Sequence, residues 1–410
     1  MINSVEFDEM ESFDMYSSKS EIILNDLKSG DSATFSLAKK ALDYYEFEKQ
    51  DIKNLYNALF TCYVDSAENY GSVKSELLST IEKIHDEEVA DVLKKLYIED
   101  PQNRSQTINT LSKLAPERKE LIYSLVNEYF PEDISYYHAS RVFDVLSDSI
   151  EFFRSRFQDL SALTQSLNFH EAYIDNLIEK WDSMKFSPTE IKSLSHVVEN
   201  TYNQYMDSIK NYTEDDSEFF NFSGIISSCI HFFTETEDQS YKIILEKAEK
   251  TGYTGFKSDI ISYNLSCGIP VKSTLWKEVM NDDYEGWELI NKLNDSGKIP
   301  LLPMEYRNEQ ALNTLIIKNY LSDDFYLKSI KLLESRKVKY NENDVTFYVF
   351  EFLLDDEESK NKYIAIGGGL EIANNKINTD NYYYDYLYSP VSKSDRDESI
   401  EEMLNSIGEE

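Results

Sequence analysis

The chain contains one close pair of cysteine and histidine, Cys229 and His231, separated by a single isoleucine. A zinc site needs about four ligands at suitable spacing. The chain has only three Cys and five His, and neither C-x-x-C nor H-E-x-x-H occurs in it. We therefore predict that this pair belongs to the structural core and that the protein binds no metal or cofactor.

A run of three glycines, Gly367–Gly369, follows a segment that we predict to be a strand. Glycine-rich turns at such junctions can present backbone N–H groups to phosphate. No G-x-x-x-x-G-K-[ST] pattern is present, and Lys376 is the one cation in the eight residues after Leu370. Glycine also suits a tight strand exit or a bulge, which the sequence favours here. Kinase, dinucleotide and G-x-S-x-G motifs are absent as well, so we expect a protein that is not an enzyme. An enzyme with a site around Gly367–Gly369 remains an alternative.

Acidic residues gather in several short runs. Paired carboxylates could bind a metal or act as acid and base, but no run follows the D-x-[DN]-x-[DN]-G calcium loop. Two readings stay open: solvated loop charge, or a docking surface whose potential attracts and selects a basic partner. The candidate partner-binding acids are Glu214, Asp215, Asp216 and Glu218 in one run, and Asp355, Asp356, Glu357 and Glu358 in another.

Five tyrosines lie within seven residues near the C-terminal end. Tyrosine buries a large apolar ring, keeps a polar tip, and is enriched in the centres of protein interfaces. The cluster could pack onto a sheet, or it could anchor a basic protein next to the acids. Its members are Tyr382, Tyr383, Tyr384, Tyr386 and Tyr388.

The overall charge limits the kinds of partner. The chain has 410 residues, with 41 Lys+Arg against 76 Asp+Glu and a net charge of −35. A protein that binds nucleic acid by neutralising phosphates would be basic, so we expect no direct nucleic-acid partner. With 30 Tyr and 22 Phe the chain is too aromatic for a disordered protein.

Compartment follows from what the sequence lacks. No stretch approaches the roughly 18 apolar residues of a membrane span. The first sixteen residues contain five acids, no Lys or Arg, and no apolar core of a secretory signal. The three cysteines are widely separated and odd in number, which argues against a disulfide framework. These features predict a cytoplasmic protein with reduced thiols and no membrane partner.

The first 296 residues read as a succession of short amphipathic helices. Apolar residues recur at helical spacing from Ile52 to Tyr63, and Asp100-Pro101 marks the end of another helix. Ser187 and Pro188 resemble a helix start, with an N-cap followed by proline at the first helical position. Short helices joined by short turns form hairpins that must stack to bury their apolar faces. No fixed repeat period is found, so we expect a degenerate HEAT-like or TPR-like α-solenoid, with an irregular helical bundle as the rival.

The pattern changes near residue 297. Gly297–Pro303 reads as a linker, which predicts an α-helical repeat-like domain over 1–296 and a small α+β module with an acidic tail over 297–410. In the module we predict helices over 307–321 and 324–336, a β-hairpin formed by 345–354 and 362–366, a further strand within 372–388 and a short terminal helix or tail. Alternation predicts that either Phe347 and Val349 or Phe350 and Phe352 face the core.

These features together predict a non-catalytic cytoplasmic scaffold that binds a basic protein through an acidic, Tyr-rich surface. The sharpest version is an immunity or inhibitor protein that neutralises a basic toxin or nuclease. A regulator or adaptor that binds a peptide in the groove of the solenoid is the second possibility. The oligomeric state does not follow from the sequence.

Overall fold

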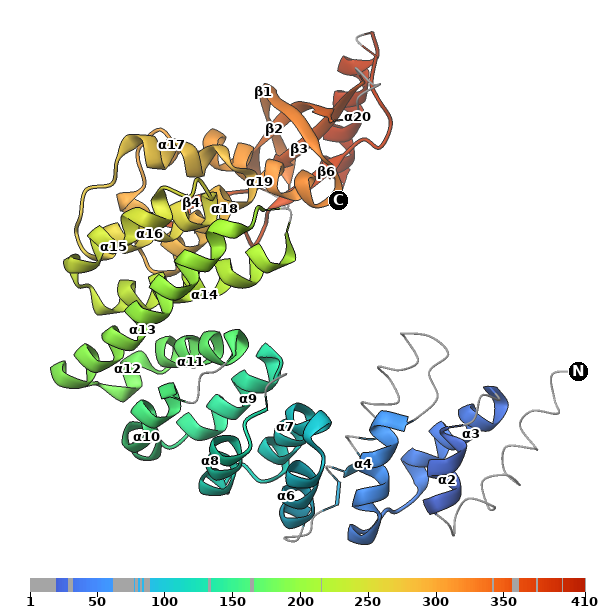
Figure 1. The fold of residues 1–410 in the computed structure, drawn as a ribbon. Coiled ribbons are helices and arrows are strands. Elements are labelled where there is room, and N and C mark those ends of the chain that lie inside the picture. The colour runs from blue at the N-terminus through green and yellow to red at the C-terminus, as the bar shows by residue number, and fades with distance from the viewer. Residues whose placement is uncertain are drawn as a thin grey trace, which may run out of the picture. The chain divides into compact units, whose positions relative to one another are not determined.

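The computed structural model is shown in Figure 1. It describes residues 20–28, 32–61, 89–131, 134–162, 166–214, 216–340, 343–355, 361–373, 375–392 and 394–409, together with 77, 80, 81, 83 and 84. The chain divides into two compact units, Met1–Thr201 and Tyr202–Glu410.

Unit 1 is helical throughout its described part. Neighbouring helices pack against one another, as α6 does with α7, α7 with α9, and α9 with α11. The division between the units falls within α13 (Pro188–Ser208). The other helices are α2 (Ser20–Asp26), α3 (Ser32–Tyr44), α4 (Ile52–Thr61), α6 (Val89–Glu99), α7 (Arg104–Leu114), α8 (Lys119–Glu128), α9 (Tyr136–Ser147), α10 (Ile150–Ala162), α11 (Leu167–Glu179) and α12 (Trp181–Met184).

Helix ends in unit 1 follow the local chemistry of the sequence. α6 ends at Glu99, directly before Asp100-Pro101, because a residue before proline is pushed out of the helical region. α13 begins with a reciprocal cap at Ser187. The Ser187 hydroxyl accepts a hydrogen bond from the backbone N–H of Glu190, and the Glu190 carboxylate accepts one from the N–H of Ser187. Both predicted boundaries are confirmed.

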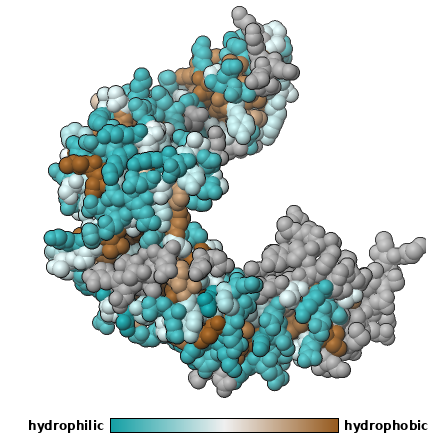
Figure 2. All heavy atoms as spheres, in the orientation of Figure 1, coloured by the Kyte–Doolittle hydropathy of each residue, from teal (hydrophilic) through white to brown (hydrophobic). Residues whose placement is uncertain are grey.

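Unit 2 begins with further helices and ends in a sheet. The helices are α14 (Ser217–Thr236), α15 (Lys242–Glu249), α16 (Thr254–Ser266), α17 (Ser273–Asn281), α18 (Asp283–Asp295), α19 (Glu309–Asp324) and α20 (Arg396–Glu409). None of the described helices in either unit has the length and apolar character needed to cross a membrane. In the view of Figure 2 hydrophilic residues cover most of the described surface, and hydrophobic residues lie in separate small groups.

Four antiparallel strands form the sheet, in the order β1-β2-β3-β6. β1 is therefore an edge strand, and its pairing with β2 contains two register shifts. A second, two-stranded sheet is formed by β4 and β5. The strands are β1 (Leu327–Tyr340), β2 (Asn343–Leu354), β3 (Lys362–Gly368), β4 (Glu371–Ala373), β5 (Lys376–Asn378) and β6 (Tyr383–Tyr386).

A helix covers each face of the four-stranded sheet. On one face α20 packs its apolar residues against Phe347 and Val349, and on the other α19 packs against Phe350 and Phe352. All four strand residues are almost completely buried. The sequence predicted that only one of these two pairs would face the core. Both pairs do, because a helix covers each face of the sheet.

The predicted hairpin and the terminal helix are confirmed, as is a mainly helical chain that ends in a small sheet. The predicted helix over 324–336 is wrong, because these residues belong to the end of α19 and to β1. The apolar residues of this segment are spaced as on one face of a helix. The segment forms a strand instead, because β2 is apolar on both faces and pairs with it on one side and with β3 on the other.

The predicted boundary at residue 297 stays a prediction. Ile299 and Leu302, which lie in the predicted linker, are 1% and 2% exposed. Just before it, the Asn294 side chain donates to the backbone oxygen of Ile377 at 2.9 Å and accepts from its N–H at 2.8 Å. These contacts join α18 to β5 across the proposed boundary.

Candidate functional site

The topology of the sheet brings two of the predicted clusters to one end. β1 begins and β2 ends there, with Leu327 opposite Leu354, and β3 begins there at Lys362. The segment after β6 continues beside β3, because the N–H of Val391 donates to the backbone oxygen of Lys362 at 2.7 Å. Asp355, the first residue of the acidic run after β2, and the last tyrosines of the Tyr cluster therefore lie at the same end of the sheet.

We call this surface the sheet end. Its backbone is fixed by β1 and β2, since the N–H of Asp355 donates to the carbonyl oxygen of Tyr326 at 2.8 Å. Its side chains come from α19, the start of β1, the end of β2 and the end of β6. The sheet end consists of Asp324, Tyr326, Asp355, Tyr386 and Tyr388.

Tyr386 joins the end of β6 to the end of α19. Its hydroxyl donates to Oδ2 of Asp324 at 2.9 Å. Its ring lies edge-on to Phe325, with ring centres 5.2 Å apart, and 4.7 Å from the ring of Tyr388. A hydrogen bond with Tyr388 raises the pKa of Tyr386, and burial and the Asp324 carboxylate raise it further. Tyr386 therefore stays a neutral donor at physiological pH.

The outer tyrosines of the sheet end are open to solvent. Tyr326 is 90% exposed and Tyr388 is 80% exposed, while Tyr386, which contacts Tyr388, is 9% exposed. Asp324 and Asp355 are also exposed. Large aromatic rings next to carboxylates on a protein surface are the composition of an interface anchor.

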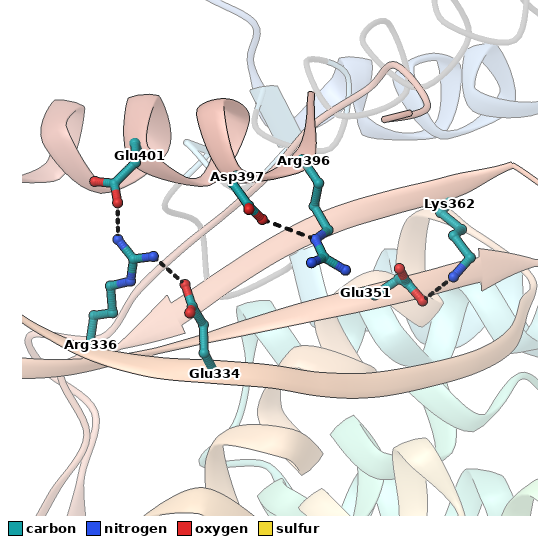
Figure 3. A network of polar contacts seen from close by, with 7 residues as sticks. All are labelled: Glu334, Arg336, Glu351, Lys362, Arg396, Asp397 and Glu401. Atoms are coloured by element: carbon teal, nitrogen blue, oxygen red, sulfur yellow. Dashed lines mark hydrogen bonds and ion pairs between the residues drawn. The ribbon is translucent and has the colours of Figure 1, made fainter. Parts of the chain in front are cut away.

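Three basic side chains on or beside the sheet form ion pairs with acids. Lys362, at the start of β3, forms an ion pair with Glu351 at 2.7 Å (Figure 3). Arg336 on β1 contacts Glu334 on its own strand and Glu401 on α20. Arg396 and Asp397 are likewise paired at 3.3 Å. These pairs join Lys362, Arg336 and Arg396 to acids outside the sheet end.

The remaining tyrosines of the predicted cluster pack onto the sheet. Tyr384 stacks on Tyr320 of α19, with ring centres 4.4 Å apart and planes 6° from parallel. Tyr382 lies 6.1 Å from the same ring. Tyr383 points to the other face, where its ring contacts Phe347. The structure therefore gives three of the five tyrosines packing roles and places Tyr386 and Tyr388 at the sheet end.

The described residues of the acidic run at 214–218 lie at the start of α14. Asp216 has a local role, because its carboxylate accepts the N–H of Thr213 at 2.7 Å and the Thr213 hydroxyl at 3.0 Å. These bonds lower the pKa of Asp216. Glu214 and Glu218 are exposed. The predicted residues Asp215, Asp356, Glu357 and Glu358 lie outside the described residues.

The glycine run has packing roles at the exit of β3. A Cβ on Gly367 would lie 2.5 Å from both Ile317 of α19 and the Tyr382 hydroxyl. A Cβ on Gly368 would lie 2.7 Å from the carbonyl oxygen of Thr346. Gly369 has φ +91°, which residues with a side chain rarely adopt. These features fit the tight strand exit that the sequence favours.

A second cluster of titratable side chains joins three helices of unit 2 and was missed by sequence reasoning. Asp259 of α16 is 3% exposed. Its Oδ1 lies 2.9 Å from Nε2 of His231 on α14 and accepts from Nζ of Lys292 on α18 at 3.1 Å. Glu285, also on α18, lies close enough for the Asp259 charge to act on it. No short motif could reveal this cluster, because its members come from separate helices.

The electrostatics of this cluster follow from burial and charge. Burial alone would raise the pKa of Asp259, but the hydrogen bond and charge of His231 and the charge of Lys292 lower it on balance. Burial, followed by the charge of Asp259, raises the pKa of Glu285 to about 7. Asp259 is thus an ionised partner of Lys292 and His231, whereas Glu285 changes its charge near neutral pH.

The cysteine and histidine pair singled out in the sequence does not form a metal centre with its neighbours. Cys229 and Cys267 are buried free thiols, as predicted, and Cys62 lies outside the described residues. His231 bonds to Asp259 instead. In the part of the chain that the structure describes, no three His, Cys, Asp or Glu side chains are arranged to hold a metal ion.

Comparison of the chain with protein-family models, with curated proteins and with solved structures gives no match. Its function is therefore argued from its own residues.

Proposed function

We propose that this chain is a non-catalytic cytoplasmic scaffold of helical-repeat type that binds a basic protein through its sheet end. The observation that supports this most is topological. Residues chosen from the sequence for different reasons, Asp355 after β2 and the tyrosines at the end of β6, lie at the same end of one sheet. At this end the largely exposed Tyr326 pairs through its backbone with Asp355, and the largely exposed Tyr388 and the carboxylate of Asp324 both contact Tyr386.

Aromatic and charged residues contribute to such a surface in different ways. Buried aromatic anchors supply most of the binding energy of an interface and set the dissociation rate. Complementary charge speeds the encounter and rejects partners of the wrong sign. With a net charge of −35 the whole chain attracts cations over the range of its field. A basic protein is the partner that fits both properties.

The sharpest form of the proposal is an immunity or inhibitor protein that neutralises a basic toxin or nuclease. Such a protein needs no chemistry of its own, because it acts by covering the surface of its target. The exposed aromatic rings and carboxylates of the sheet end are suited to that role, and the tight packing of Gly367–Gly369 supports a non-catalytic reading.

The test is affinity capture with the full-length chain from a lysate of its source cells, followed by elution with salt. The test variant combines Tyr388→Ala with Asp355→Asn. The matched control is Asp380→Asn, because this exposed aspartate precedes β6 at the opposite end of the sheet. We expect the wild type and the control to retain a basic protein that salt releases, and the double variant to lose it. Retention by the double variant, or capture of an acidic protein, would contradict the proposal.

A further inference from the structure

We propose that the outer edge of β1 binds an extended acidic segment of a partner protein, which adds a fifth strand to the four-stranded sheet. The occupant is defined by its chemistry, an extended backbone with carboxylate side chains at every second residue. In this mode of peptide recognition main-chain hydrogen bonds supply affinity and side chains supply specificity. The inference goes beyond the proposed function and does not depend on it.

The outer edge of β1 is open within the described part of the chain. β1 is the first strand in the order β1-β2-β3-β6, so β2 alone pairs with it in this sheet. Outside that ladder, no backbone hydrogen bond joins residues 328–340 to another described segment. None of the residues of β1 is buried. The N–H and C=O groups that point away from β2 are therefore left for an incoming strand.

The register shows which part of this edge can accept a strand. Both register shifts of β1 fall before Glu334, and a bulge disrupts pairing locally. From Glu334, opposite Val349, to Tyr340, opposite Asn343, the pairing is regular. We call residues Glu334–Tyr340 the β1 edge. It lies toward the end of β1 that is opposite to the sheet end, since the sheet end contains the start of this strand.

Two lysines of the β1 edge lie side by side on one face of the sheet. Successive side chains of a strand point to opposite faces. Arg336 and Val338 face α20, because Arg336 contacts an acid of that helix and Val338 packs against its apolar residues. Lys337 and Lys339 therefore point to the other face, where both are exposed. Neither forms an ion pair with a described residue, although Asp344 lies opposite Lys339 in the ladder.

These two ammonium groups decide the charge of the occupant. A strand added beside β1 places two of its own side chains opposite Lys337 and Lys339, two positions apart in its sequence. Opposite charges in such pairs are stabilising and like charges are destabilising. β1 contains five basic residues and one acid in a chain with a net charge of −35. The field of the whole chain repels an acidic peptide, so binding of such a peptide requires a local basic site.

The experiment titrates the full-length chain with a dye-labelled heptapeptide in which valine and glutamate alternate, and follows binding by fluorescence anisotropy. Reversing both charges, Lys337→Glu with Lys339→Glu, should weaken binding about tenfold, because two attractive cross-strand pairs become repulsive. Lys337→Gln with Lys339→Gln removes the charges without reversing them and should weaken binding less. The matched control, Lys94→Glu with Lys95→Glu, changes the net charge equally at two exposed lysines of α6 and should keep the affinity within about twofold.

Two further measurements test whether the peptide binds through its backbone. A fully N-methylated peptide of the same sequence has no backbone N–H donors and should not bind. Hydrogen exchange of the wild type with the unmethylated peptide should slow within the β1 edge and stay unchanged in α6. The proposal is overturned if the acidic peptide does not bind, if the N-methylated peptide binds equally well, if the Lys→Glu double variant keeps wild-type affinity, or if the protection lies elsewhere. These variants leave the sheet end intact, so the proposed function is tested separately.

Discussion

Replacing Asp259 with asparagine should destabilise unit 2 strongly. The substitution removes the charge of a carboxylate that is 3% exposed and leaves Lys292 and His231 beside a neutral amide. Breaking a buried ion pair costs about 3–5 kcal/mol because one charge stays buried without its partner. The side chains of His231 and Lys292 are 40% and 39% exposed, so both can turn partly to water. We therefore expect a loss of about 2–3 kcal/mol, below the buried-pair range.

Thermal unfolding followed by calorimetry measures this loss. For a unit of about 200 residues, 1 kcal/mol shifts the Tm by about 2–4 °C, so Asp259→Asn should lower the Tm by about 5–10 °C at pH 7. The matched control adds Lys292→Met to Asp259→Asn. It removes the stranded charge and should recover part of the loss.

The pH dependence supplies a second check on Asp259. The pKa of Asp259 is lowered in the folded state. The contribution of Asp259 to the stability of unit 2 is therefore present above the pKa of an unfolded aspartate, about 3.9, and is lost as the pH falls through the folded pKa. The difference in stability between the wild type and Asp259→Asn should shrink in acid. An unchanged Tm at pH 7, or a difference that grows as the pH falls, would refute the ion-pair reasoning.

Four further predictions concern unit 2. The hydroxyl of Tyr382 is buried without a hydrogen-bond partner in the described structure, so Tyr382→Phe should leave the Tm unchanged or raise it; a clear fall would reveal a missing partner. Gly367→Ala places a methyl group against Ile317 and should cost about 1–3 kcal/mol in urea unfolding; wild-type stability would show that α19 can move aside. Burial raises the pKa of Glu285 to about 7, so its stabilising effect is complete below about pH 4.3 and is lost as the pH rises through 7. Glu285→Gln should accordingly be more stable than the wild type above pH 7 and equal to it near pH 4. With a captured basic partner, added salt should slow association, whereas Tyr388→Ala should mainly speed dissociation. If stopped-flow kinetics showed that Tyr388→Ala slows association and leaves dissociation unchanged, this ring would not be a binding anchor.

Local sequence chemistry predicted a good part of the fold. The boundary at Asp100-Pro101, the cap at Ser187 and the hairpin of β2 and β3 depend on residues near one another in the chain. Backbone geometry and side-chain period therefore decide them with little help from distant contacts. The helix α7 shows where this reasoning stops. It is buried but rich in polar residues such as Thr107, Asn109 and Thr110, so no apolar stripe reveals its inner face.

The rest of the fold depends on contacts between segments that are far apart in the sequence, which the sequence alone did not reveal. The segment that forms β1 has apolar residues that suit a helix as well as a strand, and its pairing with β2 decides between them. In the same way, His231 and Asp259 are 28 positions apart and Asp259 and Lys292 are 33 apart. Their meeting depends on how α14, α16 and α18 pack, which periodicity within each helix does not specify. Asp355, Tyr386 and Tyr388 of the sheet end were predicted in two separate clusters, and the strand register places them at one end of the sheet, whereas Asp324 and Tyr326 were not predicted.

The edge position of β1 has a consequence for self-association. An exposed edge strand can pair with the same strand of another molecule and start aggregation. Five of the fourteen residues of β1 are basic, and two register shifts interrupt its pairing surface. Antiparallel pairing of two such edges would set cations against cations across the new ladder, which is unfavourable. In a chain that is otherwise strongly acidic, this basic strand therefore disfavours pairing between the β1 edges of two molecules. Its cationic residues are Lys328, Lys331, Arg336, Lys337 and Lys339.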